Sequence, residues 1–298
     1  LVSENRFENR QLSKSRSLAN RFPRFHRLLN DPLGVTGLIL VVAFVLSAAF
    51  APFLTPHSPS QIAIQHMFEG PSATYLLGTD QLGRDTLTRL LYGGRVALQV
   101  AAIAVSIGLI IGLLLGMIAG YGPRWLDNTL MLAFDTINSF PAIMLALAII
   151  TLTGPSLEMV IVVIIINSIP SYGRITRTQT LGIKHNEFIL AERAMGAGTF
   201  RVLFRHVMPN VVGPLLILAA MNVPVVVTIE AGLSFLGLGV RPPTPSWGSM
   251  LADGRQIIRS TPWPVIAGGI PLILTTLGFT FLGEALRDIF DPRLRKSK

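Results

Sequence analysis

The sequence predicts an all-α membrane protein, a polytopic bundle of six transmembrane helices. Half of the 298 residues are hydrophobic, only 14% are charged, and the mean hydropathy is +0.56. The apolar residues gather in runs separated by polar segments, and most runs approach the ~20 residues that a spanning helix needs. These observations exclude a soluble domain. The predicted spans are residues 34–54, 96–120, 130–152, 159–172, 211–236 and 265–282.

Two features of the composition exclude other classes of protein. The chain has no cysteine, so it has no disulfide, thiol nucleophile or thiolate metal site. The formal net charge is +9, but the basic residues lie between the spans without interleaved aromatic residues. This pattern does not indicate nucleic-acid binding.

The first span follows a basic segment, residues 1–33, which we expect to be a cytoplasmic lead-in. A cleaved signal peptide is an alternative for residues 34–54, because Ala-Ala-Phe-Ala resembles a cleavage site. The apolar run is longer than the about 7–15 residues of a signal peptide. We therefore favour a retained transmembrane helix.

Residues 55–95 form the next polar segment, an expected external loop. Asp80 and Asp85 lie close in sequence to Arg84 and Arg89, among glycines that predict turns. We expect a network of ion pairs that stabilises this loop without touching a solute.

The second span, residues 96–120, carries a glycine at every fourth position. A glycine stripe on one helix face lets another helix approach closely. We expect helix packing there, within the chain or against a second membrane subunit. The four glycines are Gly108, Gly112, Gly116 and Gly120.

Polar side chains inside the third and fifth spans are candidates for a translocation path. Polar and ionisable residues in a bilayer usually face a bundle interior or water. For Asp135 a structural hydrogen-bonding role is the alternative. The fifth span contributes Asn222, Thr228 and Glu230. The fourth span is expected to continue as helix beyond the membrane.

Residues 186–210 are the longest charged segment in the second half of the chain. The sequence predicts a helix capped by Asn186 that stops at Gly196 and Gly198, where glycine takes the left-handed conformation. A second, basic helix would then end at Pro209. Such a segment cannot lie in hydrocarbon. We expect an elbow offered to a soluble partner, with an ordinary amphipathic loop as the alternative.

The basic residues also predict the orientation. In a six-span topology, one side of the membrane holds both ends of the chain, the turn at 121–127 and the 186–210 segment. That side carries 19 of the 25 Lys and Arg residues. The positive-inside bias therefore places these regions, including the tail at 295–298, in the cytoplasm.

Signatures of chemistry are missing from the sequence. No phosphate loop of the form G-x-x-x-x-G-K-[ST] occurs, so the chain is not expected to bind ATP itself. The five histidines form no metal-binding pair at helical spacing, and no nucleophile elbow occurs. We expect no catalytic residue, no metal site and no cofactor on this chain.

Four blocks between residues 77 and 294 resemble, in the same order, the motifs of ABC-importer permeases of the dipeptide/oligopeptide/nickel family. In the second block Ala191, Gly196 and Pro209 match the family's EAA loop, whereas Leu190 and Glu192 depart from its leading Glu and second Ala. The blocks are LGTDQLGRD at 77–85, the 186–210 segment, RPPTPSWG at 241–248 and GEALRDIFDPRL at 283–294.

The resemblance implies a type I ABC importer fold with a permease core at 96–294, in the bacterial inner membrane. Its 186–210 loop would dock into a groove of an ATPase subunit. The expected partners are a second related permease, two P-loop ATPases that bind ATP and Mg²⁺, an external solute-binding protein and the bilayer. The expected ATPase-coupling residues are Glu187, Ala191, Glu192, Arg193, Gly196, Arg201, Arg205, His206 and Pro209.

A stand-alone secondary transporter or channel is the alternative function. It would show inverted halves, paired broken helices and several intramembrane charges. Only Asp135 and Glu230 lie well inside predicted spans, and the halves show no symmetry. ATP-driven import of peptides or similar small solutes is favoured. Dipeptides, oligopeptides, nickel chelates, opines and glutathione all remain candidate solutes at this point.

Overall fold

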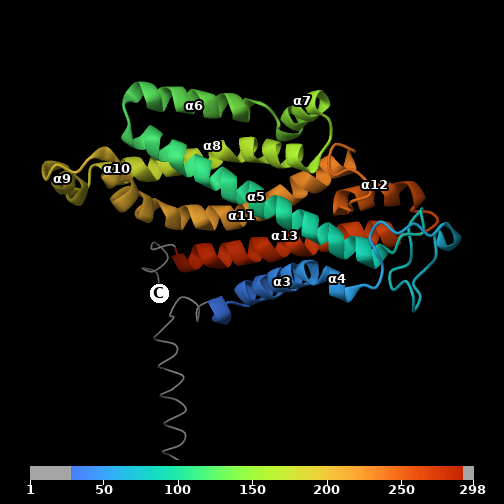
Figure 1. The fold of residues 1–298 in the computed structure, drawn as a ribbon. Helices are drawn as coiled ribbons and strands as arrows, with labels where there is room; N and C mark the ends of the chain where they lie inside the picture. Colours follow the sequence, from blue (N-terminus) through green and yellow to red (C-terminus); the bar gives the residue numbers. More distant parts are fainter. Residues whose placement is uncertain (1–27, 291–298) are drawn as a thin grey trace, which may run out of the picture.

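The computed structural model describes residues 28–290, which are helical with connecting turns and loops (Figure 1). Residues 1–27 and 291–298 lie outside this range, and with them most of the basic N-terminal segment and the 295–298 tail. The structure confirms the predicted all-α membrane bundle. Five uninterrupted helical segments are long and apolar enough to cross a membrane. They are α3 (Pro32–Ala49), α5 (Thr86–Tyr121), α8 (Leu157–Lys184), Thr199–Phe235 and α13 (Trp263–Phe290).

The predicted third span is not one helix. Residues 130–152 are divided between α6 (Arg124–Ser139) and α7 (Ala142–Thr153), which meet at 87°. Phe140 has extended backbone angles (φ −90°, ψ 130°). Pro141 accounts for this, because a proline disfavours the helical conformation of the residue before it. The bundle has six spans if this bent pair crosses the membrane as one.

The helices α5 and α8 share the most extensive contact among the described elements. The predicted glycine stripe of α5 lies in this contact. A Cβ on Gly120 would lie 2.8 Å from the carbonyl oxygen of Arg177, and a Cβ on Gly116 would lie 2.5 Å from the Cβ of Thr176. The absence of side chains on the stripe therefore permits the close approach of α8. The predicted continuation of the fourth span is also found, since α8 runs to Lys184.

The polar segments collect at two ends of the bundle (Figure 1). One end holds the start of α3, the α5–α6 turn, α9 (Glu187–Ala194) and the end of α13. The opposite end holds α4 (Ala51–Leu54), the following loop with η1 (Ile64–His66), and α12 (Trp247–Ile257). Residues 86–95, predicted as loop, are the first turns of α5, because the Asp85 carboxylate accepts a hydrogen bond from the Thr88 amide (2.9 Å) and caps the helix.

A buried ion-pair network joins this loop to α12. Asp80 lies 2.7 Å from Arg84 and 3.4 Å from Arg89, and all three side chains are buried. The predicted network is present, with two differences. Asp253 of α12 completes it, 3.4 Å from Arg84. Asp85 caps α5 instead of pairing with an arginine.

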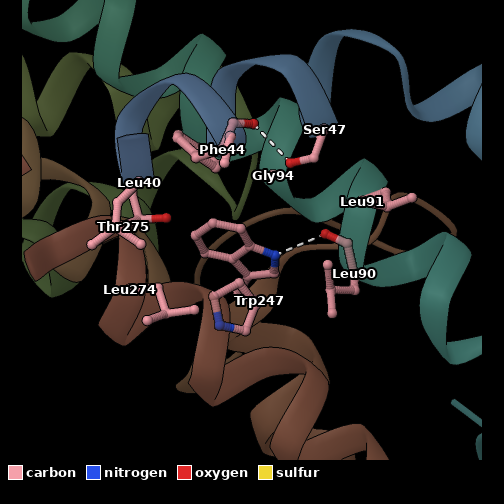
Figure 2. Close-up of a pocket in the computed structure, with 11 residues that line it drawn as sticks. Leu40, Phe44, Ser47, Leu90, Leu91, Gly94, Trp247, Leu274 and Thr275 are labelled. Atoms are coloured by element: carbon pink, nitrogen blue, oxygen red, sulfur yellow. Dashed lines mark hydrogen bonds between the residues drawn. The ribbon is translucent and has the colours of Figure 1, made fainter. Parts of the chain in front are cut away.

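An apolar cavity of about 250 Å³ lies between α3, α5, α12 and α13 (Figure 2). The buried Trp247 occupies one wall and donates a hydrogen bond from its indole nitrogen to the carbonyl of Leu90 (2.9 Å). Phe44 of α3 packs on the indole with ring centroids 5.4 Å apart. This packing fixes α3 to the bundle, and the cavity lining offers little to a polar solute.

Candidate coupling surface

The elbow at residues 186–210 turns at Gly196. After α9, the amide of Gly196 donates to the carbonyl of Arg193 (3.0 Å), and the amide of Ala197 donates to the carbonyl of Glu192 (3.0 Å). These two bonds form a Schellman motif, whose turn residue adopts the left-handed conformation. Gly196 has φ +86°, as predicted, whereas Gly198 has φ −69° and needs no glycine conformation.

The start of α9 differs from the prediction. Asn186 occupies the N-cap position, but its side chain makes no capping hydrogen bond. Its backbone carbonyl accepts the first bonds of the helix, from the amides of Ile189 (3.0 Å) and Leu190 (3.1 Å).

An apolar cluster anchors the elbow to the bundle. Ile189 of α9 is fully buried, as are Val202 and Val207 after the turn. They pack with Leu113 and Met117 of α5. Burial of a large aliphatic side chain contributes roughly 1.5–3 kcal/mol. The elbow is therefore packed against the half of α5 that carries Leu113 and Met117, in addition to its two chain connections.

Pro209 does not end the second helix, contrary to the prediction. The chain is helical from Thr199 to Phe235, through α10 (Thr199–Arg201), the wide turn η2 (Val202–Val207) and α11 (Met208–Phe235). The π-helical hydrogen-bond pattern of η2 widens the backbone immediately before the proline. A wider turn relieves the clash between the proline ring and the preceding carbonyls, so the helix continues.

The charges of the elbow fall into two groups. Glu192 is half-buried, and its Oε1 lies 3.4 Å from Nε2 of His206, across the turn. Among the described residues, the exposed Glu187 and Arg193 form no ion pair. Arg201 and Arg205 are also exposed. The remaining predicted coupling residues, Ala191, Gly196 and Pro209, present their backbone or a short side chain to solvent.

The predicted coupling residues leave out the apolar tip of the elbow. Met195 and Phe200 are 75% and 74% exposed, and Phe188 and Leu190 of α9 are also exposed. Phe200 packs on Phe204 with tilted rings whose centroids lie 4.3 Å apart. The available signal was the presence of large apolar residues in a segment too polar for the membrane. An exposed apolar group with a charged rim is typical of a protein-binding surface.

The four predicted path residues lie in different environments. Asp135 is exposed on α6 and accepts a hydrogen bond from Arg174 of α8 (2.6 Å). Asn222 is half-buried on α11, and the exposed Thr228 donates to the carbonyl of Pro224 (2.8 Å). Glu230 is buried and accepts from Ser234 of its own helix (2.7 Å). The structure does not bring these four side chains together into one site.

Within residues 28–290, no three histidine, aspartate or glutamate side chains gather as a metal ion would require. The expectation that this chain binds no metal or cofactor stays a prediction.

Comparison with known proteins adds to this geometry. Residues 112–296 match the family model described as "Binding-protein-dependent transport system inner membrane component", and residues 24–71 match "N-terminal TM domain of oligopeptide transport permease C".

Two curated relatives are similar over most of their length. The dipeptide transport system permease protein DppC of Alkalihalophilus pseudofirmus is 41% identical, over 91% of this chain and 89% of the relative. The glutathione transport system permease protein GsiD of Pectobacterium atrosepticum is 36% identical, over 91% of this chain and 90% of the relative.

A solved structure shares the fold. Its title describes inward facing conformations of the MetNI methionine ABC transporter. The similarity has a TM-score of 0.56 and 20% sequence identity, and it covers 68% of this chain and 97% of that chain.

Proposed function

The chain belongs to the family of binding-protein-dependent transport system inner membrane components, and we propose that this ABC-importer permease subunit carries peptides and is driven through the elbow at residues 186–210. The observation that carries the proposal is the construction of the elbow. Its base is buried against α5, whereas its tip exposes Met195 and Phe200. A rigid base with an apolar tip can transmit the motion of a docked partner to the membrane helices.

The energy for transport comes from partner subunits in this proposal. The chain lacks a phosphate loop, so ATP and Mg²⁺ would bind to two ATPase subunits, and this chain would catalyse no reaction. Closure of the ATPases on ATP would push the elbows, and the resulting shift of α5 and α8 would open the path outward. Each ligand shifts this equilibrium only as far as it prefers one state.

Peptides are the solute class that the relatives support. Curated relatives are named for dipeptide and di/tripeptide transport, and another is named for glutathione, itself a tripeptide-like solute. A second permease would complete the path, and an external binding protein would deliver the solute. A stand-alone secondary transporter predicts two broken helices, one in each half of the chain. The described residues contain a single broken span, formed by α6 and α7.

We further propose that the protein lies in the bacterial inner membrane with both termini in the cytoplasm. The basic bias supports this orientation. The start of α3, the elbow and the end of α13 lie at one end of the bundle, which agrees with a single cytoplasmic face (Figure 1).

The test uses two glycines of the elbow in the reconstituted transporter. Gly196 and Gly198 both have open space where a Cβ would stand, but only Gly196 has a positive φ. A β-branched residue in the left-handed region costs about 1–2 kcal/mol and distorts the turn. Gly196→Val is expected to insert and assemble but to lose solute uptake and stimulation of ATP hydrolysis. Gly198→Val adds the same bulk without this strain and should keep most of both activities. Normal uptake by the assembled Gly196→Val transporter would contradict the proposal.

A further inference from the structure

The exposed face of α6 is unusually polar for a membrane helix. Asn128, Leu132, Asp135 and Ser139 follow helical spacing, lie on one face and are exposed, and only Leu132 among them is apolar. We call these four residues the α6 stripe. On the opposite face, Phe134 is buried against Gly173 of α8. The helix is therefore fixed on α8, and the α6 stripe is exposed apart from the contact of Asp135 with Arg174 of α8.

The stripe extends into the depth of the bundle. Asp127 lies in the first turn of α6, next to the turn that shares an end of the bundle with the elbow. Asp135 is eight residues further, about 12 Å along the helix axis at 1.5 Å per residue. A charged side chain that faces lipid at such depth is strongly unfavourable. The stripe must therefore face water or protein.

Two observations favour water. The Asp135–Arg174 ion pair is well exposed, with 67% and 43% of the two side chains accessible. Charged residues are depleted from the cores of protein interfaces, so this pair is poorly suited to the centre of a permease–permease contact. The neighbouring α7 exposes Ile143, Met144 and Leu147, and this apolar face suits protein or lipid better.

The geometry of the pair also specifies a ligand chemistry. An exposed ion pair contributes little to stability, so its two charges exchange partners at little cost. A solute with one charge would leave either Asp135 or Arg174 without a partner. A solute with both an ammonium and a carboxylate group can replace both partners at once. Asp127 and Arg177, by contrast, form a less exposed pair (17% and 30%) with two contacts, which suits a fixed clamp between α6 and α8.

We infer that the α6 stripe lines the aqueous translocation path and that Asp135 and Arg174 receive the ammonium and carboxylate ends of a zwitterionic solute. The inference rests on the proposed function, because it assigns a position along the path of the same importer. It adds the residues that contact the solute and the charge pattern that they select.

The experiment exploits the absence of cysteine from this chain. Asp135→Cys in the reconstituted transporter is treated with two methanethiosulfonate reagents of similar size, one leaving a sulfonate and one leaving a trimethylammonium group. Both reagents should react, because the site is aqueous. The sulfonate adduct restores a negative charge and should keep uptake of a zwitterionic dipeptide near the level of the parent protein. The cationic adduct should lower uptake roughly tenfold, the effect of losing one charge-assisted hydrogen bond.

Matched controls separate the outcomes. Phe134→Cys, next in sequence and 2% exposed, should not react. The parent transporter with both reagents reports on cysteines of the partner subunits. Equal uptake by the two adducts, or a cysteine at 135 that reacts in the isolated chain but not in the active complex, would overturn the inference. The second result would place the stripe against the partner permease. Failure of the parent transporter to import the dipeptide with ATP would instead contradict the proposed function, and the inference would fall with it.

Discussion

Oε1 of Glu192 on α9 and Nε2 of His206 on η2 lie 3.4 Å apart, so a contact between two polar side chains connects the two arms of the elbow across the Gly196 turn. The family's EAA loop resembles this segment, but Glu192 stands where that loop has an alanine. Glu192, which departs from the family's pattern, therefore has a role within the chain. It links the two arms that the Schellman motif brings together.

Neutralising Glu187 and Glu192 in turn should distinguish contacts within the elbow from contacts with a partner subunit. Glu192→Gln is expected to reduce the protection of the elbow against limited proteolysis, by a free energy below about 1 kcal/mol, because the pair is partly solvated. Glu187→Gln removes a charge that has no ion-pair partner among the described residues. It should leave proteolysis unchanged and weaken binding of the ATPase subunit, measured by co-purification. The reverse pattern would show that Glu192 contacts the partner.

The buried base of the elbow should matter more than its exposed neighbours for stability. Ile189→Ala removes a fully buried side chain and is expected to destabilise the elbow by about 2–5 kcal/mol. Leu190→Ala, one position along and exposed, should cost little. Thermal unfolding in detergent and proteolysis at the elbow measure both variants. Similar losses for the two would mean that the base is not packed as described.

The glycine stripe should not accept a side chain where α5 meets α8. A Cβ on Gly112 would overlap the side chain of Tyr172, so Gly112→Val should sharply reduce the yield of folded protein. On α8, a Cβ added to Gly182 would meet no atom within 4 Å, so Gly182→Ala should be tolerated or slightly stabilising. Gel-filtration profiles in detergent compare the yields. A normal profile for Gly112→Val would contradict the close approach of the two helices.

The buried network at the opposite end should depend on Asp80. Asp80→Asn leaves Arg84 and Arg89 buried with less charge compensation, and breaking such a pair costs about 3–5 kcal/mol. Asp253→Asn should cost less, because its side chain is one-third exposed and its contacts are longer (3.4 and 3.9 Å). Thermal unfolding distinguishes the two. Equal losses of stability would indicate that Asp253 compensates the arginine charges as much as Asp80 does.

Periodicity and composition were sufficient to predict the bundle, the glycine stripe and the turn at Gly196. Each depends on local chemistry, namely apolar run length, missing side chains and the left-handed conformation. Proline was harder to interpret. Pro141 breaks a span that the apolar pattern predicts as continuous, whereas Pro209 lies inside a helix that it was expected to end. The difference lies in the preceding residues, since η2 widens before Pro209 and Phe140 becomes extended before Pro141.

Long-range partners were beyond sequence reasoning. Arg174 is 39 positions from Asp135, and Asp253 is 169 positions from Arg84. No local pattern pairs residues so far apart, because the packing of α6 on α8 and of α12 on α5 brings them together. For the same reason, polarity alone did not separate the buried Glu230 from the exposed Asp135.

A single cysteine at Met195 or Phe200 tests the role of the elbow most directly. Both side chains are exposed at the tip, and the chain has no native cysteine. In the assembled transporter, a short crosslinker on Met195→Cys or Phe200→Cys is expected to join this chain to an ATPase subunit, with a yield that changes when ATP is added. Crosslinking to the external binding protein, or labelling of either cysteine by a membrane-impermeant reagent added outside intact cells, would contradict ATPase coupling through this elbow.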